Sequence, residues 1–118
     1  MATLSQFRSA ADTKTFEPGE TIFVEGDEGG VMYVVVEGSV RLSVTGRTLE
    51  KVGKGSVFGE MALIDASPRS ATATAITACA LAPVTARGFE DLVRESPEFA
   101  IEIMRVMAAR LRSMDRRL

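Results

Sequence analysis

Residues 58–71 read Phe-Gly-Glu-Met-Ala-Leu-Ile-Asp-Ala-Ser-Pro-Arg-Ser-Ala. Gly59 lets the backbone approach a ligand closely, because glycine has no side chain. Residues 60–64 can form one helical turn, and the free amides at its start attract an anion such as a phosphate. The proline that follows turns the chain so that Arg69 and Ser70 return to the same place, where the guanidinium can donate two hydrogen bonds. The segment therefore predicts a phosphate-binding site.

Glu60 does not suit a phosphate, since a carboxylate only accepts hydrogen bonds and repels an anion. A ribose 2′-hydroxyl is a suitable donor for it, and this contact would distinguish ribose from deoxyribose. The alternative is that Glu60 and Arg69 pair with each other inside the domain, although a buried ion pair is weak evidence for stability. Both interpretations stay open at this point.

Short runs with strand character surround this segment, and glycines separate them. These runs are 21–24, 32–36, 40–44, 48–52, 70–76 and 79–84. They are rich in β-branched and aromatic residues, and 70–76 alternates alanine with threonine. Glu37-Gly38 and Thr45-Gly46 are typical of tight hairpin turns. Turn signals at this spacing favour an antiparallel sandwich or barrel, and a count of about eight strands predicts a jelly roll.

The last third of the chain changes to helical spacing. Phe89, Leu92 and Val93 predict a short helix. Ser96-Pro97 is a strong start signal for a second helix that runs to the C-terminus, with serine as N-cap and proline in the first position. Its apolar stripe is expected to pack on the sandwich or on a second copy's helix. The stripe consists of Phe99, Ala100, Ile103, Met104, Met107, Leu111 and Met114.

We therefore predict a single domain over residues 1–118, mainly β with flanking α. The expected architecture is an eight-stranded antiparallel jelly roll with a short helix after Gly59 and C-terminal helices. Leu4, Phe7 and Ala10-Ala11 also predict a short N-terminal helix.

The composition excludes several classes of site. The 118 residues include no histidine, which removes Ser-His triads, nearly all zinc sites and the usual haem ligand. A single cysteine, Cys79, allows no internal disulfide. The net charge of −2 gives no general attraction to nucleic acid or membrane. With no signal-peptide pattern and no apolar run of the roughly 18–20 residues that span a membrane, we expect a cytoplasmic protein without catalytic residues, metal or cofactor.

Residues 58–63 followed by 68–71 resemble the phosphate-binding cassette of the cyclic-nucleotide-binding domain family. That family includes bacterial catabolite activators, regulatory subunits of cyclic-AMP-dependent kinase, and nucleotide-gated channels. Residues 16–27 are similar to its first glycine-rich hairpin and 33–40 to its next strand pair, and Ser96-Pro97 lies where its last helix begins. The resemblance covers nearly the whole chain.

The resemblance implies a role for each site residue. Glu60 would hold the ribose hydroxyl, the amides of the helical turn would face the phosphate or ribose, and Arg69 and Ser70 would clamp the phosphate. Channel members cover the base with an arginine of the last helix, which Arg110 matches. Met114 falls where catabolite activators reach the base with small polar side chains. The candidate ligand-binding residues are then Phe58, Gly59, Glu60, Met61, Ala62, Arg69, Ser70, Ala71, Arg110 and Met114.

The function implied is that of a sensor domain that binds a cyclic nucleotide. Cyclic AMP is expected in preference to cyclic GMP, because a threonine after the phosphate-binding arginine often accompanies good cyclic GMP binding, and this chain has Ser70. Binding is expected to move the final helix by shifting a conformational equilibrium.

Three alternatives come from other classes. The chain could be the sensor part of a transcription factor, channel or kinase regulator, or an interaction module that binds no nucleotide. A cupin-like enzyme is disfavoured, because such sites generally need histidine ligands. The expected partners are a cyclic nucleotide, a protein effector, and a second copy through Met104, Met107 and Leu111. We expect no DNA-binding segment in this chain and no membrane contact.

Overall fold

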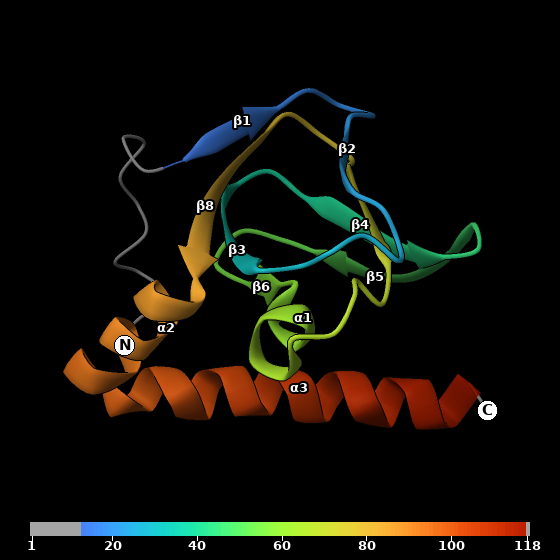
Figure 1. Ribbon diagram of the computed structural model, residues 1–118. Helices are drawn as coiled ribbons and strands as arrows, with labels where there is room; N and C mark the ends of the chain where they lie inside the picture. The colour runs from blue at the N-terminus through green and yellow to red at the C-terminus, as the bar shows by residue number, and fades with distance from the viewer. Residues whose placement is uncertain (1–12, 118) are drawn as a thin grey trace.

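The computed structural model describes residues 13–117, with side chains up to residue 112. Eight antiparallel strands in that range form two four-stranded sheets (Figure 1). The first sheet has the order β1 (Lys14–Phe16), β8 (Cys79–Thr85), β3 (Val31–Glu37), β6 (Val57–Phe58). The second has the order β2 (Thr21–Phe23), β7 (Thr72–Ala75), β4 (Val40–Val44), β5 (Arg47–Val52). The predicted eight-stranded jelly roll is confirmed.

The space between the two sheets is filled by side chains from alternate strand positions. In β7 the predicted alternation holds, because Ala73 and Ala75 are buried while Thr72 and Thr74 are half-buried. Phe58 is fully buried here, and its ring contacts Phe23 and Tyr33 at centroid distances of 5.8 and 5.4 Å. Small alanines in β7 leave room for these aromatic rings in one hydrophobic cluster.

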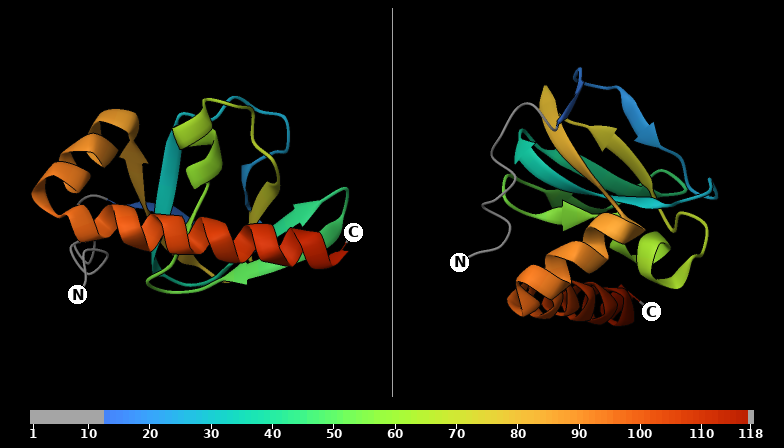
Figure 2. Two further views of the ribbon diagram at one scale, coloured as in Figure 1. Left: turned by 90° about the horizontal axis from the view of Figure 1, so that it is seen from below. Right: turned by 60° about the vertical axis from the view of Figure 1, so that its left-hand side comes forward.

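In the described part of the chain, three helices lie outside the sandwich. Helix α2 (Ala86–Glu95) starts where the Thr85 hydroxyl accepts a hydrogen bond from the Gly88 amide at 3.0 Å. Helix α3 (Pro97–Arg117) follows and starts where the Ser96-Pro97 pair predicts. The short helix α1 (Glu60–Asp65) lies between the sandwich and α3, which Figure 2 shows from two further sides.

Helix α3 buries only one side. Phe99 and Ile103 pack with β3 and β8 in a second hydrophobic cluster, on the outer face of the first sheet. Met107 is partly buried against the same cluster, whereas Met104 and Leu111 are 55% and 53% exposed. Phe99, Ile103 and Met107 of the expected stripe therefore pack on the sandwich, and packing of Met104 and Leu111 on a second copy's helix stays a prediction.

The Glu37-Gly38 turn does not close a hairpin. Strand β3 belongs to the first sheet and β4 to the second, so this turn carries the chain across the sandwich. Gly38 has φ 91°, and a Cβ there would lie 2.3 Å from the Ala78 carbonyl oxygen. By contrast, Thr45-Gly46 does join a hairpin, with Val44 opposite Arg47. The predicted N-terminal helix lies outside the described residues.

Candidate functional site

A pocket opens where α1, the segment before β7, and α3 meet the second sheet. Its cavity volume is about 80 Å³. Its lining consists of Phe23, Leu42, Leu49, Glu50, Gly59, Glu60, Met61, Ala62, Arg69, Ser70, Ala71 and Arg110. Apolar walls with four charged side chains suit an organic ligand that carries a few polar groups.

Gly59 places α1 against Arg69. It is the N-cap residue of α1 with φ 82° and ψ 9°, a left-handed conformation that glycine adopts without strain. A Cβ on Gly59 would lie 2.8 Å from Nη1 of Arg69, so only glycine lets the guanidinium lie this close. The Gly59 carbonyl oxygen accepts a hydrogen bond from that same Nη1 at 3.2 Å.

Arg69 is buried at the pocket wall, with 6% of its surface exposed. Its Nη2 donates to the Val31 carbonyl oxygen at 2.7 Å, and its guanidinium carbon lies 4.0 Å from the centroid of the Phe23 ring. Its Nε is buried with no hydrogen-bond partner among the described residues. Burial lowers the pKa of Arg69, and electrostatic interactions with Tyr33 and Asp27 offset this in part. Among the described residues, two of the five N–H donors of this buried cation make hydrogen bonds, so three remain for an anion.

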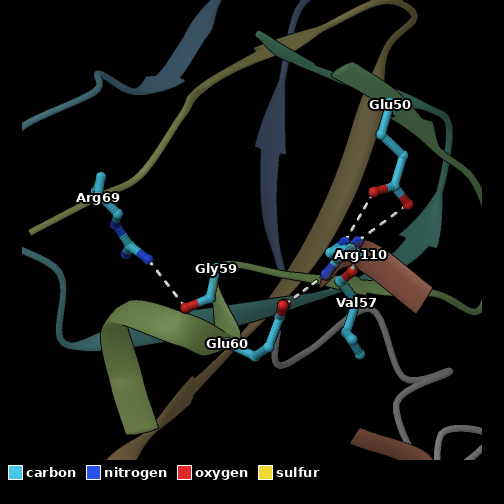
Figure 3. Close-up of polar contacts among 6 residues, drawn as sticks. All are labelled: Glu50, Val57, Gly59, Glu60, Arg69 and Arg110. Atoms are coloured by element: carbon cyan, nitrogen blue, oxygen red, sulfur yellow. Dashed lines mark hydrogen bonds and ion pairs between the residues drawn. The ribbon is translucent and has the colours of Figure 1, made fainter. Parts of the chain in front are cut away.

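Glu60 does not pair with Arg69. Its side chain is 2% exposed, and its Oε1 accepts from Nη1 of Arg110 at 2.6 Å (Figure 3). The alternative of a Glu60–Arg69 pair is therefore wrong. The partner comes from α3, fifty residues further along the chain.

Arg110 of α3 donates hydrogen bonds to three residues beside the pocket. These are the carboxylates of Glu50 and Glu60 and the carbonyl of Val57. Its Nε and Nη2 donate to both oxygens of Glu50 at 2.8 and 3.2 Å, and Nη2 also donates to the Val57 carbonyl oxygen at 2.7 Å. Burial would lower the pKa of Arg110, but its hydrogen bonds and charge interactions with Glu50 and Glu60 outweigh this and raise it. The Arg110 guanidinium lies between the carboxylates of Glu50 and Glu60 (Figure 3).

Most residues predicted from the sequence line the pocket, namely Gly59, Glu60, Met61, Ala62, Arg69, Ser70, Ala71 and Arg110. Phe58 does not line it and instead supports Phe23 from the core. The side chain of Met114 lies outside the described residues. The prediction missed Phe23, Leu42, Leu49 and Glu50, because strand patterns do not show which strand positions face the pocket.

The comparisons with known proteins identify the family. A model of the cyclic nucleotide-binding domain matches residues 13–96, and the chain belongs to that family. A cyclic AMP receptor protein from Thermus thermophilus is 36% identical over 107 residues, which is 86% of this chain and 50% of that protein. A cyclic nucleotide-gated potassium channel from Mesorhizobium japonicum is 41% identical over 107 residues, 91% of this chain and 29% of the channel.

A solved structure supports the same family assignment. The catabolite activator protein of Thermus thermophilus superposes with a TM-score of 0.79 at 32% identity, covering 98% of this chain and 57% of that one. The chain thus spans about half the length of the receptor and activator proteins that it matches.

In residues 13–117, no helix is both long enough and apolar enough to cross a membrane. Among the side chains described, those of residues 13–112, no metal-ligand cluster of three or more acidic or cysteine groups forms.

Proposed function

We propose that this domain binds a 3′,5′-cyclic nucleotide in the pocket, cyclic AMP in preference to cyclic GMP, and acts as a regulatory sensor without catalysis. The buried Arg69 guanidinium carries this proposal, because its Nε is unpaired among the described residues and Ser70 lies beside it in the lining. Arg69 and Ser70 would bind the cyclic phosphate, and Glu60 would accept from the ribose 2′-hydroxyl. The regulatory role is supported by a relative, a cAMP-dependent protein kinase regulatory subunit from Debaryomyces hansenii, which is 44% identical over 66 residues.

Isothermal titration of cyclic AMP and cyclic GMP, with Arg69→Ala beside the unmodified protein, tests this assignment. Removing one partner of a buried charge contact costs about 2–5 kcal/mol, so the affinity for either nucleotide should fall at least thirtyfold. Arg94→Ala is the matched control, since Arg94 is an exposed arginine on α2 that pairs with Asp91 and does not line the pocket. No binding to the folded, ligand-free protein would instead favour an interaction module that binds no nucleotide.

Coupling between the nucleotide and α3 is part of the same proposal. Arg110 on α3 holds the carboxylate of Glu60, which the ribose hydroxyl would also contact. A ligand that changes this hydrogen bond has a different affinity for each position of α3, and that difference is what shifts an equilibrium. The cytoplasmic location and the protein effector stay predictions, and a sensor part of a larger transcription factor or channel stays the alternative.

A second copy of the chain is the proposed occupant of the open face of α3. Ile101, Met104 and Leu111 are exposed there and Ala108 is half-buried, at spacings of three, four and three residues. This is the heptad spacing of a two-helix seam. Met107, which was expected in the contact, packs inward instead.

A further inference from the structure

Glu50 is a carboxylate on a core-facing position of β5. In the register of β4 and β5, Leu42 lies opposite Glu50 and Val40 lies opposite Val52. Leu42, Val40 and Val52 all belong to the core between the sheets, so Glu50 shares their face. A charged group on such a face is costly unless it has partners. Arg110 is one partner, and the pocket that Glu50 lines gives room for another.

The order of polar groups along the pocket places Glu50 at the end where a base would lie. Figure 3 shows Arg69 and Glu50 on opposite sides of the site, with Glu60 and Arg110 between them. In a nucleotide the ribose links the phosphate to the base. If Arg69 binds the phosphate and Glu60 the ribose, the base extends toward Glu50, between the apolar side chains of Leu42 and Leu49.

Arg110 and Glu50, the two charged groups at this end of the pocket, differ in how many further hydrogen bonds they can make. Arg110 already donates from Nε, from Nη1 and twice from Nη2. Each oxygen of Glu50 accepts one hydrogen bond from Arg110, whereas a carboxylate oxygen can accept two. The Glu50 side chain is 39% exposed, so a ligand can reach it. Glu50 is the acceptor that can still serve a base.

We propose that Glu50 is a base-specificity residue that accepts a hydrogen bond from the exocyclic amino group of a purine. This assignment rests on the proposed function of the pocket. A carboxylate has no hydrogen to donate, so it favours a base edge with a donor over an edge with acceptors only. Adenine carries such an amino group at C6 and guanine at C2, and the recognition chemistry is the same for both.

Four ligands test the assignment by calorimetry on the unmodified protein. Purine riboside 3′,5′-cyclic monophosphate is cyclic AMP without its 6-amino group, and inosine 3′,5′-cyclic monophosphate is cyclic GMP without its 2-amino group. In at least one pair the amino-bearing ligand should bind about tenfold tighter, as expected for a hydrogen bond to a charged group. The pair that shows this ratio identifies the base. Equal affinities within both pairs would overturn the assignment.

Glu50→Leu then locates the selectivity in this side chain. The substitution also releases Arg110, which changes the affinity of all four ligands, so the ratio within each pair is the informative quantity. We expect the ratio to fall to about one in Glu50→Leu and to a smaller but detectable value in Glu50→Gln, which keeps one acceptor oxygen. Glu37→Gln, which removes a carboxylate from an exposed pair with Lys54, should keep the full ratio. A ratio that persists in Glu50→Leu would overturn the assignment, whereas no binding of any nucleotide to the unmodified protein would refute the proposed function.

Discussion

Gly59 combines two constraints at one residue. Its φ of 82° costs a residue with a side chain about 1–2 kcal/mol, and a Cβ would displace the Arg69 guanidinium from its carbonyl partners. We therefore expect Gly59→Ala to lower both the melting temperature and the affinity for cyclic AMP, the latter about tenfold or more. Calorimetric titration and thermal unfolding measure the two effects separately.

Gly55 provides the control for Gly59. It has φ 86°, but a Cβ there would meet no atom within 4 Å, and it does not line the pocket. Gly55→Ala should lower the melting temperature by a similar amount and leave the affinity unchanged. Equal losses of affinity in both variants would show that Gly59 acts through backbone strain alone.

Residue types in the cassette were predictable from the sequence, but their partners were not. The residue type alone indicates a role in binding at four positions, namely Gly59, Glu60, Pro68 and Arg69. Of these, Gly59, Glu60 and Arg69 line the pocket. The contact of Glu60 with Arg110 spans fifty residues, and Glu50 lies on a strand of ordinary pattern. Such contacts depend on how α3 crosses the sandwich, which local spacing does not determine.

At the scale of elements, Arg110 connects α3 to the binding site. Replacing Arg110 with Met removes its bonds to Glu50, Glu60 and Val57, and it leaves Glu60 buried without its cation. We expect cyclic AMP to change amide hydrogen exchange along α3 in the unmodified protein, and this ligand effect to be lost in Arg110→Met. The variant should also be less stable by about 3–5 kcal/mol, because a buried charge loses its partner.

Arg105→Met is the matched control, since Arg105 is an exposed arginine on the same helix and lies outside the pocket lining. It should keep the ligand effect on α3. The same ligand effect in Arg110→Met as in the unmodified protein would contradict coupling through this residue.

Elements were easier to predict than the connections between them. Strand and helix positions follow from periods of two and 3.6 residues, and β7 and α2 lie within or around the predicted runs. The Gly38 turn was misinterpreted because a glycine with positive φ suits a hairpin and a crossing between sheets equally well. Only pairing over long sequence distances, such as β3 with β8, distinguishes the two.

For the whole molecule, the open face of α3 determines the assembly state we expect. A seam of Ile101, Met104, Ala108 and Leu111 would bury apolar surface that one copy leaves in water. Sedimentation velocity over a range of concentrations should therefore show a monomer–dimer equilibrium. In Met104→Glu, two carboxylates would enter the seam in place of two thioethers, and the dissociation constant should rise at least tenfold.

Ile76→Glu separates this seam from general surface hydrophobicity. Ile76 is another exposed apolar residue, but it follows β7 in the sandwich and does not belong to α3. The same charge placed there should leave the dissociation constant unchanged. If the unmodified protein stays monomeric at several hundred micromolar, a second copy does not cover this face. If Ile76→Glu weakens the dimer as much as Met104→Glu, the contact lies elsewhere on the molecule.

Because Arg110 lies on the same helix, a dimer formed through this seam would also change how freely α3 moves when a nucleotide binds. Adding cyclic AMP should then shift the dissociation constant of the dimer.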